Sequence, residues 1–122
     1  MDKTIDILLI DDETEFISAL AERLKIRGYQ PQTADSGETG LTMIASARFD
    51  IVVLDLMMPG LSGLETLKQI RAMDSNLPVI LLTGHGSTRD GLEGMRMGAR
   101  DYLMKPLDIN DLIDKISSAL NH

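Results

Sequence analysis

A short apolar segment that ends on an acid constrains the fold of this chain more than any other feature. Ile51–Leu54 is aliphatic at every position, which is typical of a strand whose two faces are both buried in a parallel sheet. Asp55 follows directly. Pro59, Gly60 and Gly63 then favour a loop. Asp55 is therefore expected at the carboxyl edge of a central strand, where open α/β sheets bind their ligands.

The rest of the chain alternates between strand-like and helix-like segments. Further strand-like runs occupy 5–10, 29–34, 79–83 and 101–104. Apolar residues at helical spacing mark helices at 14–27, about 37–47, 64–73, 88–97 and 109–120. Strict alternation with short links predicts right-handed crossovers, and hence an α/β, doubly wound (βα)5 fold with a parallel sheet. The polarity of 29–34 places that run at an edge and favours the strand order 2-1-3-4-5.

Composition narrows the class of protein. The 122 residues and 43% hydrophobic content suit a single domain over 1–122. The absence of cysteine excludes thiolate metal sites and fits a reducing cytoplasm. A formal charge of −7, with only two Tyr and two Phe, argues against direct nucleic-acid binding. Since no apolar run reaches membrane-spanning length and no signal peptide is evident, we expect a soluble, cytoplasmic protein without membrane contact.

Several polar residues stand at the carboxyl ends of the expected strands. They are Asp11, Asp12, Asp55, Thr83 and Lys105. Because the carboxyl ends of parallel strands meet at one edge of a sheet, these side chains are expected to line one crevice. An Asp-Asp pair after a strand is more often a helix cap or a solvated turn, and a Lys-Pro pair is usually a loop. The five residues together, at one edge of a sheet, are typical of a functional site.

Three carboxylates in one crevice repel one another and call for a cation. Oxygen ligands favour Mg²⁺, the usual companion of phosphoryl groups, whereas zinc lacks its thiolate and imidazole ligands here. His85 is more typical of a loop residue than of a ligand. Beside such a metal, Asp55 is expected to attack phosphorus and give an acyl phosphate. Thr83 and Lys105 suit stabilisation of the phosphoryl oxygens.

Four motifs occur in the order of a known family. They are Leu-Ile-Asp-Asp-Glu at 9–13, Val-Val-Leu-Asp-Leu-Met-Met-Pro at 52–59, Leu-Leu-Thr-Gly-His-Gly at 81–86 and Gly-Ala-Arg-Asp-Tyr-Leu-Met-Lys-Pro at 98–106. With them the chain resembles, from Ile5 to Leu120, the receiver domain of bacterial two-component response regulators. It is similar to the chemotaxis-regulator-like and NtrC/FixJ-like receivers. The resemblance implies a flavodoxin-like sandwich and a role in phosphorelay signal transduction.

The resemblance also implies a role for each acid. Asp55 would accept a phosphoryl group from a sensor histidine kinase or a phosphotransfer protein. Asp12 and Asp55, with the Met57 backbone carbonyl, would bind Mg²⁺, and Asp11 would hold a metal-bound water. The domain would be a regulatory phosphoacceptor and no ordinary enzyme, catalysing only its own Mg²⁺-dependent phosphorylation and dephosphorylation.

By the same resemblance the phosphoryl group drives a switch. The Thr83 hydroxyl would move toward the phosphoryl oxygens, which Lys105 also contacts, and Tyr102 would turn inward. The surface of the fourth helix, fifth strand and fifth helix would then control an output domain or a partner protein. The domain would be a monomer or a phosphorylation-dependent dimer. The residues alone leave Tyr102 open as a half-buried edge residue, and they leave open a stand-alone regulator or part of a longer chain.

Three alternative functions can be compared with the residues. Haloacid-dehalogenase-like hydrolases carry an acid two residues after the nucleophile, where this chain has Met57. An FMN binder needs a phosphate loop after the first strand, where 11–13 is acidic and repels phosphate. A degenerate receiver that docks without phosphorylation usually lacks an acid, the Thr or the Lys, and all of these are present.

Two further expectations concern the backbone. The resemblance implies a cis Lys105–Pro106 bond. The helix at 88–97 is expected to be the least stable element, because Gly91 and Gly94 each cost about 1 kcal/mol relative to Ala. The glycines either permit close packing on the sheet or ease a rearrangement on phosphorylation, and we favour the second. The large side chains available to anchor this helix are Leu92, Met95 and Met97.

Overall fold

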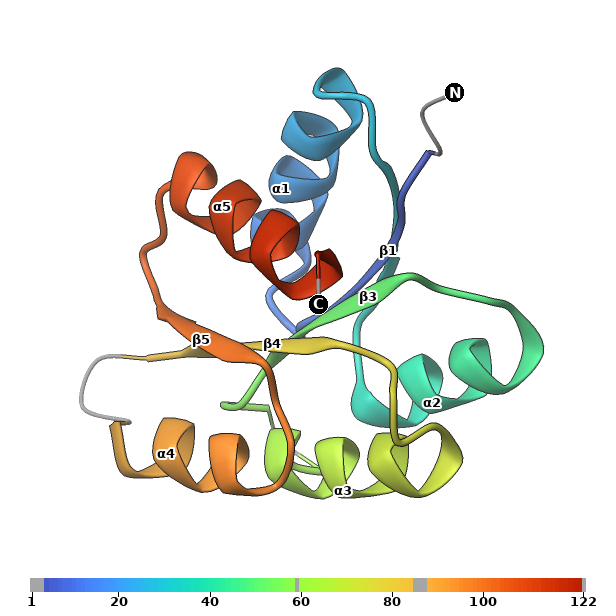
Figure 1. Ribbon diagram of the computed structural model, residues 1–122, viewed down its shortest axis with the longest axis vertical. Helices are drawn as coiled ribbons and strands as arrows, with labels where there is room; N and C mark the ends of the chain where they lie inside the picture. The colour runs from blue at the N-terminus through green and yellow to red at the C-terminus, as the bar shows by residue number, and fades with distance from the viewer. Residues whose placement is uncertain (1–3, 59, 85–87, 122) are drawn as a thin grey trace.

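The protein contains one parallel sheet covered by helices on both faces (Figure 1). The computed structural model describes residues 4–58, 60–84 and 88–121, so the expectations for Pro59, His85 and Gly86 lie outside the described residues. The strands are β1 (Asp6–Ile10), β2 (Gln30–Ala34), β3 (Ile51–Asp55), β4 (Val79–Thr83) and β5 (Asp101–Met104). Their order is β2-β1-β3-β4-β5 and every neighbouring pair is parallel. The predicted fold class and strand order are confirmed.

The helices divide between the two faces of the sheet. They are α1 (Thr14–Ile26), α2 (Gly37–Ser46), α3 (Gly63–Met73), α4 (Thr88–Arg96) and α5 (Ile109–Leu120). Helices α1 and α5 cover one face, and α2, α3 and α4 cover the other (Figure 1). None of the helices in the described ranges is long and apolar enough to cross a bilayer.

The core has two layers because successive residues of a strand point to opposite faces. In β1, Ile7 and Leu9 pack with α1 and α5, whereas Leu8 and Ile10 pack on the face of α2 and α3. Strands β3 and β4 are buried at every position, which accounts for their continuous apolar sequences. Strand β2 lies at an edge and buries only Ala34 fully. Each fully buried large aliphatic side chain contributes roughly 1.5–3 kcal/mol.

The helix starts show which polar side chains serve the backbone. Ser36 and Ser62 each accept a hydrogen bond from the N–H three residues on, and Asp108 accepts one from the N–H two residues on. These bonds satisfy N–H groups that have no partner within the helix. Glu13 stands at the corresponding position of α1, but its side chain makes no capping bond. Its carboxylate is therefore available for another contact.

Gly63 sets how closely α3 follows the end of β3. A Cβ on Gly63 would lie 2.4 Å from Leu56 Cα and 2.5 Å from the Asp55 carbonyl oxygen. Both are backbone atoms, so no side-chain movement could make room. Any larger residue would push α3 away from the loop that follows Asp55.

Helix α4 is anchored differently from the expectation. Leu92 is 50% exposed and does not anchor it, whereas Met95 is half-buried against the core. Among residues 89–96, the buried positions are the two glycines, Gly91 and Gly94. A Cβ on Gly94 would lie 2.2 Å from Leu81 Cδ1. Gly94 is therefore explained by close packing on the sheet, which is the interpretation that we did not favour from the sequence.

Candidate functional site

Two buried carboxylates lie side by side at the carboxyl edge of the sheet. Asp55 is the last residue of β3, and Asp11 comes directly after β1. Ile10 pairs with Leu54 in the parallel register, so the two acids follow paired positions on neighbouring strands. Their exposed fractions are 0% for Asp11 and 1% for Asp55. The sheet thus places two acids where water can solvate neither fully.

Asp12 completes a group of three carboxylates. One oxygen from each of Asp11, Asp12 and Asp55 lies within 4.8 Å of the others. Asp12 is exposed, so the group has a buried side and an open side. Asp11 Oδ2 is buried, and the Lys105 ammonium lies 2.7 Å from it. Three carboxylate oxygens so close together are the hard ligands that a divalent cation such as Mg²⁺ prefers.

Burial and charge act together on Asp55. Desolvation raises the pKa of Asp55 from 3.8 to about 6, and the neighbouring Asp11 adds to the rise. The Met57 N–H donates to Asp55 Oδ1 at 3.1 Å and opposes the shift, as does Lys105. The folded protein therefore holds an ionised Asp55 at a cost in stability.

Lys105 comes directly after β5, and its side chain reaches the carboxylates that follow β1 and β3. Its backbone N–H donates to the Thr83 carbonyl at 2.8 Å, and its bond to Pro106 is cis, as expected. The ammonium lies 2.7 Å from Asp11 Oδ2 and 3.7 Å from Asp55 Oδ2. Burial on its own would lower the pKa of Lys105, but the contacts with Asp11 and Glu13 outweigh burial and raise it. The ammonium therefore stays charged.

Two partners of Lys105 were not expected from the sequence. The ammonium donates a hydrogen bond to Glu13 Oε1 at 2.6 Å and lies 4.5 Å from the centre of the Phe16 ring. Glu13 and Lys105 are 92 positions apart in the chain. The available signal was the third acid after Asp11 and Asp12, which the strand pattern also places at this edge.

Thr83 and Tyr102 both lie beneath α4. Thr83 ends β4, is 1% exposed, and donates from its hydroxyl to the Leu103 carbonyl at 3.4 Å. Tyr102 is half-buried and packs against the core. A Cβ on Gly91 would lie 3.4 Å from the Tyr102 ring and 3.5 Å from Thr83 Cγ2. The methyl group of Thr83 and the ring of Tyr102 thus both pack against α4 at Gly91.

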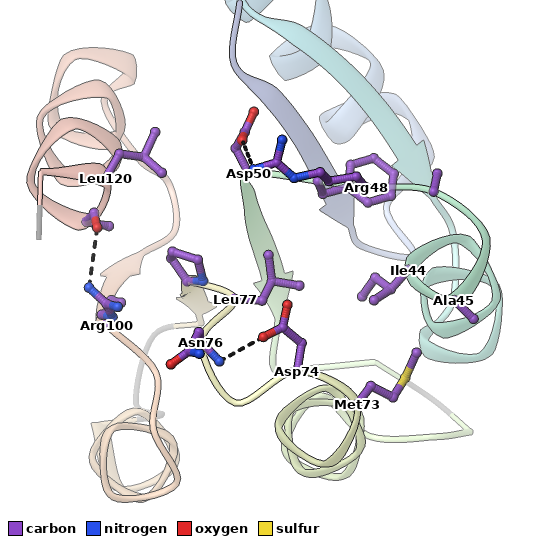
Figure 2. Close-up of a pocket in the computed structure, with 14 residues that line it drawn as sticks. Ile44, Ala45, Arg48, Asp50, Met73, Asp74, Asn76, Leu77, Arg100 and Leu120 are labelled. Carbon is purple, nitrogen blue, oxygen red and sulfur yellow. Dashed lines mark hydrogen bonds and ion pairs between the residues drawn. The ribbon is translucent and has the colours of Figure 1, made fainter. Parts of the chain in front are cut away.

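A large groove lies at the opposite edge of the sheet and takes no part in this site (Figure 2). It has a volume of about 760 Å³ and runs between the ends of α2, α3 and α5. Its charged side chains are paired within the fold: Arg48 lies 3.8 Å from Asp50, and Arg100 donates to the Ala119 carbonyl. The two arginines lie on opposite sides of the groove (Figure 2). Among the described residues that line this groove, no set of polar side chains converges as it would in a ligand-binding site.

Comparison with known proteins assigns the family. Residues 7–117 match the model of the response regulator receiver domain. The uncharacterized transcriptional regulatory protein YkoG of Bacillus subtilis is 41% identical over 114 residues, which cover 93% of this chain and 50% of YkoG. The transcriptional regulatory protein ZraR of Escherichia coli K12 is 36% identical over 118 residues, which cover 97% of this chain and 27% of ZraR.

Solved structures agree with this assignment. A response regulator receiver domain protein from Clostridium thermocellum matches with a TM-score of 0.92 and 36% identity, covering 96% of this chain and 94% of that one. The structure of FixJ-N matches with a TM-score of 0.91 and 31% identity, covering 99% and 97%. The chain belongs to the receiver domain family of two-component response regulators, which act in phosphorelay signalling. It spans half or less of the length of YkoG and ZraR.

Proposed function

We propose that this domain takes a phosphoryl group on Asp55 from a sensor histidine kinase or a phosphotransfer protein, with the aid of Mg²⁺. The observation that carries the proposal is the buried Asp55 carboxylate between the Asp11 and Asp12 carboxylates and the Lys105 ammonium. Asp12, Asp55 and the Met57 backbone carbonyl are the proposed metal ligands, and Asp11 would hold a metal-bound water. Bound Mg²⁺ would offset the carboxylate charge and that of the incoming phosphoryl oxygens.

The transfer is a displacement at phosphorus. One carboxylate oxygen of Asp55 forms a bond to phosphorus as the bond from phosphorus to the donor's imidazole nitrogen breaks, and that nitrogen keeps the electron pair. The charge spreads over the phosphoryl oxygens, toward which Lys105 and Thr83 would donate hydrogen bonds. A carboxylate nucleophile is already ionised, so no general base is needed.

The signal would leave through the surface of α4, β5 and α5. Thr83 and Tyr102 both lie against the position of Gly91 in α4, so a hydroxyl drawn toward a phosphoryl group disturbs the packing of this helix. Leu92 and Met104 are 50% and 43% exposed on α4 and β5 and offer an apolar contact. The recipient would be an output domain, a separate protein, or a second copy in a phosphorylation-dependent dimer.

Intact mass spectrometry tests the transfer. The domain is incubated with Mg²⁺ and acetyl phosphate, with EDTA and the Asp55→Asn variant as controls. The proposal predicts the addition of one phosphoryl group to wild type with Mg²⁺, and none in either control. A wild type that stays unmodified while a well-characterised receiver is modified in parallel would indicate a docking module that works without phosphorylation.

A further inference from the structure

The Glu13 side chain makes no capping hydrogen bond in the helix that it begins. Glu13 is the N-cap of α1, a position where Ser, Thr, Asp or Asn usually binds the free N–H groups, yet its carboxylate makes no such bond. Its backbone N–H instead donates to Asp11 Oδ1 at 2.9 Å. This bond leaves Asp11 Oδ2 to face Lys105, and the Glu13 carboxylate reaches Lys105 as well.

The ammonium of Lys105 is held off the phosphoacceptor. It lies 2.6 Å from Glu13 Oε1 and 2.7 Å from Asp11 Oδ2, but 3.7 Å from Asp55 Oδ2. The Phe16 ring, with its centre 4.5 Å away, supports the ammonium in this place. Of the two close carboxylates, Asp11 belongs to the expected metal set, whereas Glu13 lies outside it. Glu13 is therefore the partner of Lys105 that would stay free to bind the ammonium when a metal is bound.

We propose that Glu13 is a positioning residue that retains the Lys105 ammonium away from Asp55 until a phosphoryl group draws it across. The inference rests on the proposed function of Asp55. The Glu13 side chain is 63% exposed, and an ion pair so exposed is weak and easily exchanged. A phosphoryl group carries close to two negative charges and offers several acceptor oxygens, so it competes well for the ammonium. Glu13 would slow phosphorylation without preventing it.

Glu13→Gln removes the charge and keeps the shape, and Glu15→Gln is the matched control. Glu15 is an exposed acid in the first turn of α1, so both variants lose one negative charge near the site. The first measurement is the ¹³C signal of the Asp55 carboxyl carbon at pH 8 in EDTA, without phosphodonor. Glu13→Gln is expected to shift this signal as Lys105 approaches Asp55, and Glu15→Gln is expected to leave it in place.

The second measurement is the rate of phosphorylation by acetyl phosphate with Mg²⁺. Glu13→Gln should react about two- to fivefold faster than Glu15→Gln, the range that loss of an exposed ion pair allows. In a Lys105→Met background the two variants should react at equal rates, because the retained ammonium is gone. A purely electrostatic effect of Glu13 on the phosphodonor would survive in that background.

The outcomes separate this inference from the proposed function. Equal Asp55 signals in the two glutamine variants, or equal rates with Lys105 present, would overturn the role of Glu13 while Asp55 still accepts a phosphoryl group. A difference in rate that persists in the Lys105→Met background would also overturn it. If wild type takes no phosphoryl group, the proposed function fails and this inference fails with it.

Discussion

Gly94 of α4 packs so closely against Leu81 of β4 that a Cβ on Gly94 would lie 2.2 Å from Leu81 Cδ1. Leu81 is fully buried, so its side chain has little room to move aside. Gly91 differs: a Cβ there would make an ordinary contact of 3.4 Å with the Tyr102 ring. The two glycines of one short helix therefore serve different purposes.

This contrast predicts opposite effects of alanine at the two positions. Gly91→Ala should raise the free energy of unfolding by up to about 1 kcal/mol, because alanine is the better helix former and fits. Gly94→Ala should be at least about 1 kcal/mol less stable than Gly91→Ala, because overpacking a core costs about 1–3 kcal/mol. Urea unfolding of both variants measures the difference. Equal stability would show that Leu81 moves aside freely.

Asp55→Asn is expected to stabilise the metal-free domain. The pKa of Asp55 in the fold, about 6, is above its ordinary value of 3.8, so the fold disfavours the ionised acid. The penalty is absent below pH 3.8, grows as the pH rises through the interval up to about 6, and is complete above it. At pH 8 in EDTA the variant should gain on the order of 3 kcal/mol.

Thermal and urea unfolding at pH 8 and pH 4 in EDTA measure this effect. The gain should be largest at pH 8 and close to zero at pH 4. Asp50→Asn makes a poor control because Asp50 accepts a hydrogen bond from the Asp6 N–H. Glu15→Gln is the better comparison for loss of one charge, because Glu15 is exposed and lies outside the group of three carboxylates. A lower melting temperature for Asp55→Asn than for wild type at pH 8 contradicts net repulsion at this site.

Mg²⁺ should raise the melting temperature of wild type more than that of Asp55→Asn. A cation bound to the folded state alone stabilises it in proportion to its affinity, and the variant loses one charged ligand of the proposed set. Titration of both proteins with MgCl₂ at constant ionic strength, with NaCl as the balancing salt, separates binding from screening. Identical shifts for the two proteins would place the cation elsewhere.

Helix α4 is expected to exchange its amide hydrogens faster than α1. In α4 the buried positions among residues 89–96 are glycines, and Leu92 is half-exposed. In α1 the side chains of Ile17, Leu20 and Leu24 are buried. Few buried apolar contacts mean a low free energy of local opening. Hydrogen exchange of the unphosphorylated domain measures this, and equal protection of residues 91–96 and 17–24 would refute it.

The fold could be predicted because burial on two faces leaves an unambiguous pattern. Strands β3 and β4 have no exposed position, so their sequences carry no polar residue before the final Asp55 and Thr83. The polar edge strand β2 is equally distinctive. Once the strand order is known, the carboxyl ends meet at one edge, and the proximity of Asp11 and Asp55 follows from the register.

The contacts of Lys105 with Glu13 and Phe16 could not be predicted in this way. They depend on how far the flexible Lys105 side chain reaches from its loop to the start of α1, which is distant in sequence, and residue spacing carries no information about that reach. The orientation of α4 on the sheet could not be predicted from the sequence either. Its buried face is set by Gly94 against Leu81, and an apolar pattern read from large residues gave Leu92 an anchoring role that it does not have.

The central claim is that Asp55 is the phosphoacceptor, and reductive trapping tests it most directly. Borohydride reduces an acyl phosphate of aspartate to homoserine, which peptide mass spectrometry assigns to a position. After incubation with acetyl phosphate and Mg²⁺, we expect homoserine at position 55, and none when EDTA replaces Mg²⁺. Homoserine at Asp11 or Asp12 with position 55 unchanged, or no homoserine at any position, would contradict the account.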